Sequence, residues 1–244
     1  MNNIIVNADD FGARASVNKA IVSLFDSGIL SSTTLMANMP GFDEAVELAH
    51  QHKIIDRVGA HLVLTEGAPL TEGIKSVAYL FNKEQDGNIR KLLIKKLFYL
   101  DKTQKTLIYK EYSAQIEKIR RAGIKINHID THQHMHDMPG IMQVLIKLIK
   151  EHKIPSMRIL NNLEKTSAHK NTYRNLINKY LKLKRLNYSD YFGSRIDYLL
   201  NLERNPLIAE NRTIEIMVHP DYNRTGEITD VFSNTEYNFD YIKT

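Results

Sequence analysis

The sequence predicts an α/β protein built around a parallel sheet. Short apolar, β-branched runs alternate repeatedly with longer segments of helical periodicity, and this alternation is typical of parallel strands joined by helical crossovers. The 244 residues show no internal repeat and no Pro/Ser-rich linker. We therefore expect a single domain over residues 1–244. The alternation alone does not decide whether the sheet is open or closed into a barrel.

The first half of the chain predicts three strands separated by two helices. The strand segments are rich in β-branched residues, and they are Ile4–Asn7, Ser32–Met36 and Val58–Leu64. The helical segments repeat apolar residues every three or four positions, and they are Ser16–Asp26 and Phe42–His52. Gly28 follows the first helix, where a residue without a Cβ favours a left-handed cap.

The region from Thr65 to Asn88 has no clear periodicity. It is interrupted by residues that favour turns, namely Gly67, Pro69, Gly73 and Gly87. We expect a long functional loop here. With the helix that follows, it would form an insertion of about residues 65–105.

The second half returns to alternating elements. The helical segments are Ile89–Leu100, Leu107–Ala122, Gly140–His152, Asn171–Leu186 and Ile196–Leu202. The strand segments between them are Ile126–Asp130, Met157–Leu160 and Thr213–Val218. Gly123 and Pro139 mark a helix end and a helix start in this half.

The composition excludes several kinds of chemistry. The sequence has no cysteine, which removes disulfides, thiolate metal sites and cysteine nucleophiles. The GxSxG and HExxH motifs and Gly-rich phosphate loops are also missing. Neither a secretory signal nor a membrane-spanning apolar segment is visible, so we predict a cytoplasmic protein without a membrane partner.

The net charge of +5 comes from lysines that cluster in two segments, Arg90–Lys105 and Lys179–Arg185. Apolar residues recur between these lysines at helical spacing, which indicates solvated faces of two helices. An acidic partner is the alternative, but no nucleic-acid-binding motif accompanies the charge. We therefore expect no nucleic-acid partner.

Polar residues follow four of the predicted strands. They lie in the segments Asn7–Gly12, Gly59–Leu62, His128–His136 and Met217–Pro220. Active sites of parallel α/β proteins form at the carboxyl ends of the strands, so these segments are expected to converge.

The adjacent carboxylates Asp9 and Asp10 lie at the end of the first strand. Two neighbouring carboxylates repel each other unless a cation absorbs their charge. One of them would then bind a metal while the other stays free as a base. The alternative is a structural role, because Asp also favours the first turn of a helix.

Five polar residues alternate strictly after the fourth strand begins, and they are His128, Asp130, His132, His134 and His136. At strand period they would all face one way. Histidine is the commonest metal ligand, and a neighbouring carboxylate can fix its tautomer. Each histidine alone also fits a surface position, and the spacing does not decide which one binds. His132 is the best placed, because the strand should end there.

His61 and His219 each stand alone at the end of an apolar strand. A hydrogen-bonded core histidine is the ordinary interpretation of such a residue. The convergence of the neighbouring strands favours a functional role for both instead.

These segments together resemble the YdjC-like (ChbG/HpnK) carbohydrate deacetylase family. The resemblance runs from Asn7 to Pro220. Its motifs are Asn7-Ala8-Asp9-Asp10-Phe11-Gly12, Ser32-Thr33-Thr34, Gly59-Ala60-His61 with Leu64-Thr65, His128-Ile129-Asp130-Thr131-His132-Gln133-His134, and His219-Pro220.

The resemblance implies a TIM-barrel-like (β/α) fold related to polysaccharide deacetylases, with one divalent metal ion, Mg²⁺ or Zn²⁺. By motif position it implies that Asp10, His61 and His132 bind the metal. It also implies that Asp9 is the general base and His219 the general acid. Asp130 would contact and orient a metal ligand, and Arg158 would help to position a catalytic group.

The implied reaction is hydrolysis of the N-acetyl group of an acetylated sugar, such as a chitooligosaccharide or related amino sugar. The resemblance also implies a homodimer. Two alternatives stay open: a metal-dependent phosphoesterase, and a non-catalytic sugar-binding protein on the same scaffold.

Two departures from the family pattern stand out. Residue 221 is Asp, where Gly often follows His-Pro, and the chain ends at Thr244, soon after that motif. Relatives usually continue into another helix and a final strand. We therefore expect the barrel to be distorted or incompletely closed.

Overall fold

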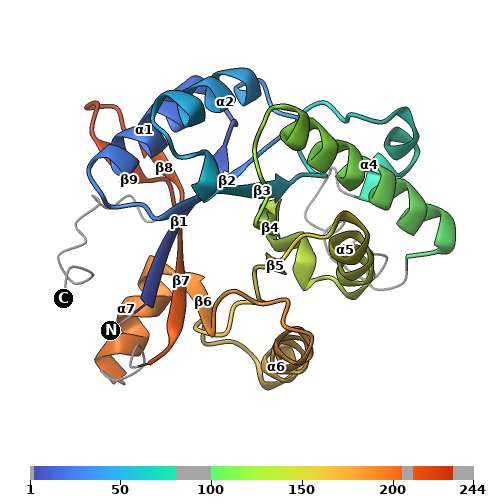
Figure 1. Cartoon of the computed structure of the whole chain (residues 1–244). Helices are drawn as coiled ribbons and strands as arrows, with labels where there is room; N and C mark the ends of the chain where they lie inside the picture. The colour runs from blue at the N-terminus through green and yellow to red at the C-terminus, as the bar shows by residue number, and fades with distance from the viewer. Residues whose placement is uncertain (1–2, 81–99, 205–210, 233–244) are drawn as a thin grey trace.

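A computed structural model describes residues 3–80, 100–204 and 211–232 (Figure 1). Within these residues the main sheet has seven parallel strands in the order β5-β4-β3-β2-β1-β7-β6. They are β1 (Asn3–Phe11), β2 (Ser32–Leu35), β3 (Val58–Leu62), β4 (His128–Thr131), β5 (Ser156–Met157), β6 (Tyr191–Ser194) and β7 (Thr213–Val218). A separate hairpin of β8 (Pro220–Tyr222) and β9 (Ile228–Asp230) follows β7.

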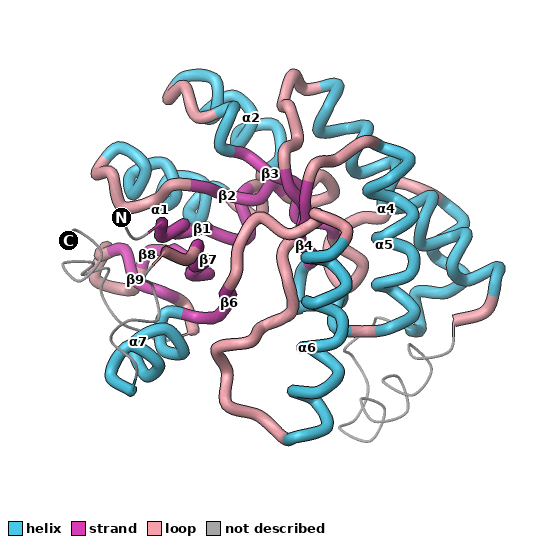
Figure 2. The backbone as a smooth tube through the Cα atoms, turned by 60° about the horizontal axis from the view of Figure 1, so that its bottom comes forward, coloured by secondary structure: helices cyan, strands magenta, loops and turns pink. Residues whose placement is uncertain are grey.

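Helices surround the curled sheet on its outer side (Figure 2). They are α1 (Ala15–Asp26), α2 (Phe42–Gln51), α4 (Lys102–Arg121), α5 (Pro139–His152), α6 (Ala168–Leu183) and α7 (Arg195–Arg204). Three 3₁₀ segments complete the described elements, η1 (Ile55–Arg57), η2 (Glu72–Leu80) and η3 (His132–Asp137). None of the helices in these described ranges has the length and apolar character that crossing a bilayer requires.

The strands follow one another around the curl in chain order. β1 lies between β2 and β7 and pairs with β7 over Asn3–Ala8. The strands at the two ends of the sheet, β5 and β6, form no ladder with each other in the described residues, and an isolated bridge joins Met157 of β5 to Asn187, in the segment before β6. The fold is therefore an α/β, TIM-barrel-like one that is distorted and incompletely closed, as predicted. The irregular seam lies between β5 and β6.

The strands separate an apolar layer from a polar interior. Alternate residues of β7, such as Ile214 and Ile216, are fully buried on the side that the helices cover. Glu215, between them, is equally buried but bonds to Arg158 inside the curl. The hydrophobic core thus lies between the sheet and the helices, and the interior of the barrel is left for polar groups.

Most predicted elements are confirmed with boundaries shifted by a few residues. The strand predicted at Met157–Leu160 is instead the short β5, and β6 was not predicted. The helix predicted at Ile89–Leu100 lies almost entirely outside the described residues. The described part of the loop after Thr65 contains η2 (Glu72–Leu80).

Candidate active site

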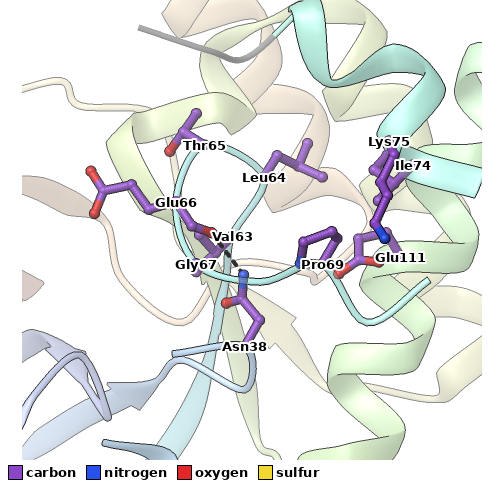
Figure 3. A pocket seen from close by; sticks show the side chains of 10 residues that line it. All are labelled: Asn38, Val63, Leu64, Thr65, Glu66, Gly67, Pro69, Ile74, Lys75 and Glu111. Atoms are coloured by element: carbon purple, nitrogen blue, oxygen red, sulfur yellow. Dashed lines mark hydrogen bonds between the residues drawn. The ribbon is translucent and has the colours of Figure 1, made fainter. Parts of the chain in front are cut away.

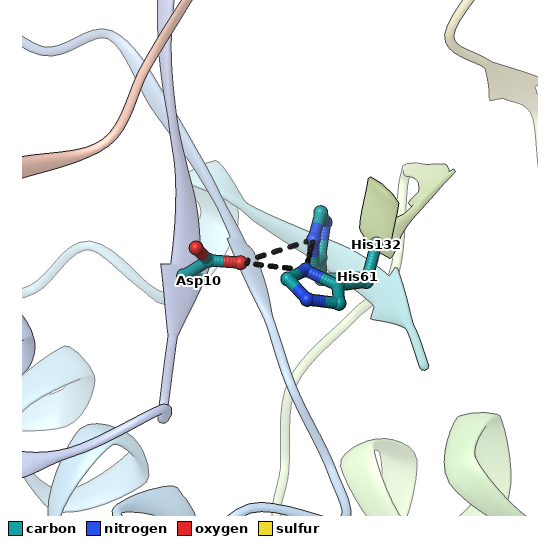
Figure 4. Close-up of side chains that lie close together, drawn as sticks. All are labelled: Asp10, His61 and His132. Carbon is teal, nitrogen blue, oxygen red and sulfur yellow. Dashed lines mark hydrogen bonds and ion pairs between the residues drawn. The ribbon is translucent and has the colours of Figure 1, made fainter. Parts of the chain in front are cut away.

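Three side chains from three strand ends converge at the carboxyl end of the sheet (Figure 4). Asp10 Oδ1 lies 3.2 Å from His61 Nε2 and 3.1 Å from His132 Nδ1. The two histidine nitrogens are 3.3 Å apart. Asp10, His61 and His132, the three residues predicted as metal ligands, thus present one atom each to a common point.

These separations fit a shared metal ion. Ligand atoms that bind one ion at about 2.0–2.2 Å lie roughly 3 Å from one another. Asp9, His61 and Asp130 form a second, overlapping group in the described residues. However, both of its carboxylates already bond to Arg158. The first group is therefore the better candidate, and its two imidazole nitrogens and one carboxylate oxygen suit zinc while admitting other divalent ions.

Asp10 reaches this point because of its backbone. Its φ is +67°, in the left-handed region that residues with a Cβ seldom adopt. The pairing of β1 with β2 is also irregular between Ala8 and Phe11. This break in the strand allows Asp9 and Asp10, which would point oppositely on a regular strand, to face the same cavity.

His61 is oriented by a buried carboxylate. Its Nδ1 lies 2.6 Å from Asp130 Oδ1 and 3.2 Å from Thr34 Oγ1. A proton on Nδ1 that bonds to Asp130 leaves the lone pair of Nε2 facing Asp10 and His132. Burial alone would lower the pKa of His61, but Asp130 and Asp10 raise it well above its ordinary value.

His132 turns the other ring nitrogen inward than His61 does. Its Nδ1 faces Asp10, and its Nε2 lies 3.2 Å from the Glu66 carboxylate. β4 ends one residue earlier, at Thr131, and the chain turns into η3 at His132. His132 is therefore placed by a turn that follows the strand.

Asp9 is held by Arg158 through two parallel hydrogen bonds. Arg158 Nη2 donates to Asp9 Oδ1 at 2.6 Å, and Nη1 donates to Oδ2 at 2.7 Å. Burial alone would raise the pKa of Asp9, but Arg158, with smaller effects from His61 and His219, brings it well below its ordinary value. Asp9 is therefore ionised at neutral pH.

The same guanidinium binds two further carboxylates. Arg158 Nη1 lies 2.7 Å from Asp130 Oδ2, and Nε donates to Glu215 Oε1 at 2.7 Å. All four side chains are buried. Arg158 thus links the predicted base Asp9 to Asp130, which orients His61.

The pKa of Asp10 is also lowered. Burial opposes this shift, but the hydrogen bonds from His132 and His61 bring the pKa well below its ordinary value. Asp10 is therefore ionised at neutral pH and offers an anionic oxygen that a cation would favour.

His219 follows the end of β7 and lies close to Asp9. Its Nε2 is 3.9 Å from Asp9 Oδ2, and its backbone N–H donates to Asp230 Oδ2 at 2.9 Å. The ring of Phe232 packs edge-on against it, with the two ring centres 4.4 Å apart. His219 therefore flanks the ligand cluster from the end of β7.

The three candidate ligands, the predicted base and the predicted acid line one open cavity of about 600 Å³; they are Asp10, His61, His132, Asp9 and His219. Its wall is completed by residues from η3, the end of β6, the start of α7 and the segment after the hairpin, including Gln133, His134, Ser194, Arg195 and Phe232. A volume of this size suits a small organic ligand such as one or two sugar units.

The alternation of polar residues from His128 to His136 follows a strand only as far as Thr131, where β4 ends. His128 is buried at the start of β4, where its Nδ1 lies 2.6 Å from Asn127 Oδ1, and burial lowers its pKa to about 4. His136 is buried too, with its Nδ1 2.7 Å from Thr131 Oγ1. His134 lines the cavity but is not among the converging atoms. The prediction of one common face was wrong beyond Thr131, because η3 replaces the strand period.

Among the residues that contact the predicted groups, Glu215, Thr34 and Glu66 were not predicted to have a role in the site. Glu215 and Thr34 lie within strands, and a charged residue in the apolar run of β7 is the signal that could have found Glu215. Glu66 lies in the loop for which the sequence predicted only a functional role.

The fold and the site together define an α/β-barrel protein with a candidate metal-assisted hydrolytic centre. The chain belongs to the YdjC-like protein family, whose sequence profile matches residues 3–241.

Relatives of known name are found in several bacteria. A carbohydrate deacetylase of Clostridium beijerinckii is 33% identical over 223 residues, which are 90% of this chain and 81% of that protein. A carbohydrate deacetylase of Brevibacillus brevis is 38% identical over 155 residues, which are 62% of this chain and 57% of that protein.

The fold also matches a solved structure. A proposed cellobiose-phosphate cleavage protein of Enterococcus faecalis aligns with a TM-score of 0.68 and 23% identity, over 98% of this chain and 87% of that one. This likeness supports the barrel architecture.

Proposed function

We propose that this protein is a metal-dependent hydrolase that removes the N-acetyl group from an acetylated amino sugar and releases acetate. The observation that carries the proposal is the convergence of Asp10, His61 and His132 beside Asp9 and His219 in one open cavity. The names of the relatives support a carbohydrate substrate. A chitooligosaccharide or a related amino sugar fits this description.

A cation bound by Asp10, His61 and His132 would act as a Lewis acid toward water and the acetyl carbonyl. Asp9 is placed to accept the proton of the attacking water, and Arg158 keeps it ionised and fixed in orientation. His219, across from it, is placed to donate a proton to the amine nitrogen as the C–N bond breaks. One water is consumed, and acetate and a free amino sugar leave.

The supporting groups act through these residues. Asp130 lies 2.6 Å from His61 Nδ1, where it favours a proton, and shares Arg158 with Asp9. The base and one ligand are therefore held by the same buried network, which lets the protein keep both in register before substrate binds.

The test is acetate release from a panel of N-acetylated sugars, with metal analysis of the same sample. Asp9→Asn should retain the metal and lose about 10²–10⁴-fold in kcat, the contribution of a general base. Asp43→Asn, an exposed change on α2, is the control and should behave as wild type.

An Asp9→Asn variant that keeps its metal and its full activity would contradict the base assignment. Hydrolysis of phosphate esters but not of acetamides would favour a phosphoesterase. Sugar binding without acetate release would favour a binding protein on the same scaffold.

A further inference from the structure

The carboxylate of Glu66 faces the outer nitrogen of His132. Glu66 Oε1 lies 3.2 Å from His132 Nε2, and Gln133 Nε2 donates to the same oxygen at 3.1 Å. The Glu66 side chain is 43% exposed, whereas that of His132 is 14% exposed. A largely covered histidine therefore has a carboxylate on the side away from the candidate ligand position.

This contact matters because a neutral imidazole has one donor nitrogen and one acceptor nitrogen. His132 can offer a lone pair at Nδ1 only if its proton is on Nε2. An ionised carboxylate accepts hydrogen bonds but does not donate them, so Glu66 favours the Nε2–H form, whereas Asp10 Oδ1, 3.1 Å from Nδ1, favours a proton on the inner nitrogen when no cation is bound.

The two histidines of the cluster are opposite in this respect. His61 places Nδ1 against Asp130, which favours a proton there, and points Nε2 inward. His132 points Nδ1 inward and turns Nε2 toward Glu66. Each histidine thus has its own carboxylate on the outward nitrogen, one buried and one at the rim of the cavity.

The loop that carries Glu66 is fixed close to that residue. Asn38 Nδ2 donates to the Glu66 carbonyl at 2.8 Å, and Ala68 N–H donates to the Asn38 carbonyl at 3.2 Å. Gly67 has a φ of +73°, and a Cβ there would lie 2.6 Å from the Asn38 carbonyl oxygen. The backbone beside Glu66 therefore has little room to move.

Helix α4 forms hydrogen bonds with both ends of the same loop, and Figure 3 shows Glu111 of this helix beside Pro69. Gln115 bonds to both the N–H and the carbonyl of Val63, at 2.9 and 2.7 Å. The buried Glu111 accepts hydrogen bonds from the N–H groups of Leu70 and Thr71 at 3.0 and 2.8 Å. The segment from Val63 to Thr71 is thus a preorganised arm that presents Glu66 to His132.

We propose that Glu66 is a positioning residue that sets the tautomer and ring orientation of His132 for metal binding. The proposal rests on the metal centre of the proposed function. It assigns the region after β3 a definite task in the site, besides any contact it makes with substrate.

The test compares Glu66→Ala and Glu66→Gln with the control Glu72→Ala, which removes an exposed carboxylate that bonds only to Lys75 in the described contacts. Zinc affinity is measured by calorimetry with a competing chelator. The tautomer of His132 is read from the side-chain ¹⁵N spectrum of the metal-free protein, with its signals assigned by their loss in His132→Gln. Thermal unfolding of the metal-free variants reports on the fold.

Glu66→Ala should weaken zinc binding about 10–100-fold, as removal of such an outer partner typically does. It should also reduce the Nε2–H population of His132, with the melting temperature of the metal-free protein unchanged. Glu66→Gln, whose amide oxygen can still accept, should lie between Glu66→Ala and wild type. Glu72→Ala should match wild type in all three measurements.

Wild-type zinc affinity and an unchanged tautomer in Glu66→Ala would overturn the proposal. Weaker zinc binding accompanied by a lower melting temperature and an unchanged tautomer would also overturn it, because the residue would then be merely structural. If the wild type binds no zinc, the metal centre fails. The tautomer in the metal-free variants then still decides whether Glu66 sets His132.

Discussion

The left-handed backbone conformation of Asp10 lets both carboxylates at the end of β1, Asp9 and Asp10, face the cavity. Its φ of +67° turns it toward His61 and His132, while Asp9 remains paired with Arg158. Strain of this kind costs about 1–3 kcal/mol and persists where surrounding contacts enforce it. The division between ligand and base is therefore a consequence of backbone conformation at one residue.

The site also depends on Arg158, whose single positive charge does not balance the carboxylates around it. One guanidinium faces the carboxylates of Asp9, Asp130 and Glu215 in a buried setting. Burial raises the pKa of Glu215 to about 7, and nearby Asp130 adds to this, although Arg158 and Tyr188 oppose it. Glu215 is the member of this network that holds a proton most readily.

The proton on Glu215 makes the stability of the fold depend on pH. Because the folded-state pKa of Glu215 lies above its ordinary value of 4.5, the folded state binds more protons than the unfolded state between those two pH values. Stability therefore falls as pH rises from about 4.5 to about 7. At about 1.4 kcal/mol per pKa unit, the full effect is about 3 kcal/mol.

Glu215→Gln removes the titrating group and keeps an oxygen for Arg158. Its stability relative to wild type should therefore rise by up to about 3 kcal/mol between pH 5 and pH 8. Urea unfolding of both proteins at several pH values measures this difference. A difference that stays constant over the range would show that Glu215 has an ordinary pKa.

The residues of the site could be predicted to different extents. Asp9, Asp10, His61, His132 and His219 stand at strand ends in short motifs, and the structure brings all five to one cavity. Glu66 and Glu215 escaped prediction because their roles depend on which side chain lies across a turn or inside the curl. Sequence spacing carries no information on such distant pairs.

At the scale of elements, the arm from Val63 to Thr71 depends on close packing at Gly67. Gly67→Ala would place a Cβ 2.6 Å from both the Asn38 carbonyl oxygen and Met39 Sδ, at a φ of +73°. The backbone conformation alone costs a residue with a Cβ about 1–2 kcal/mol. The clash adds to this, so the arm should shift and withdraw Glu66 from His132.

Gly226→Ala is the matched control, because Gly226 has a φ of +84° and a Cβ added there would meet nothing within 4 Å. Gly226→Ala should lower the free energy of unfolding only by the cost of a positive φ, without a clash. Urea unfolding and zinc affinity should therefore separate the two variants, with zinc binding weakened in Gly67→Ala alone. Equal losses in both variants would mean that Asn38 and Met39 yield without moving the arm.

Element boundaries show why periodicity is a limited guide at the site. The alternation from His128 to His136 predicts one continuous strand, yet β4 ends at Thr131 and η3 begins. Gln133 and His134 both adopt positive φ there. β6 was not predicted because its four residues, Tyr191–Ser194, are too short to show an alternation.

At the scale of the molecule, the seven strands are joined unevenly. β1 and β7 pair over six consecutive residues each, so the first and last strands of the sheet along the chain are well connected. On the side of the sheet where β5 and β6 lie, the backbone contacts include Met157 N–H of β5 to the carbonyl of Leu186, before β6, at 2.7 Å, and Asn162 N–H, after β5, to the carbonyl of Phe192 in β6 at 3.2 Å. The seam therefore relies on side chains as well as on ladder hydrogen bonds.

Asn162, in the segment after β5, is one of the side chains that bridge this seam. Its Nδ2 donates to the Asp190 carbonyl at 3.0 Å, and its Oδ1 accepts from Phe192 N–H at 2.9 Å. Asn162→Ala removes both bonds and should cost about 1–3 kcal/mol. Because the loss is local, amide hydrogen exchange should accelerate in β6 while β1 keeps its protection.

Asn3→Ala is the matched control, since Asn3 Nδ2 bridges β1 and β7 by bonding to Thr213 Oγ1 at 3.1 Å. The adjoining ladder should carry that junction without the side chain, so exchange in β7 should barely change. Mass-spectrometric exchange of both variants and wild type compares the two junctions directly. Uniform acceleration in Asn162→Ala would mean that the barrel opens as one cooperative unit, and the β5–β6 seam would then not be its weakest junction. Selective acceleration of β6 would place the flexible side of the barrel next to α7, which forms one wall of the cavity.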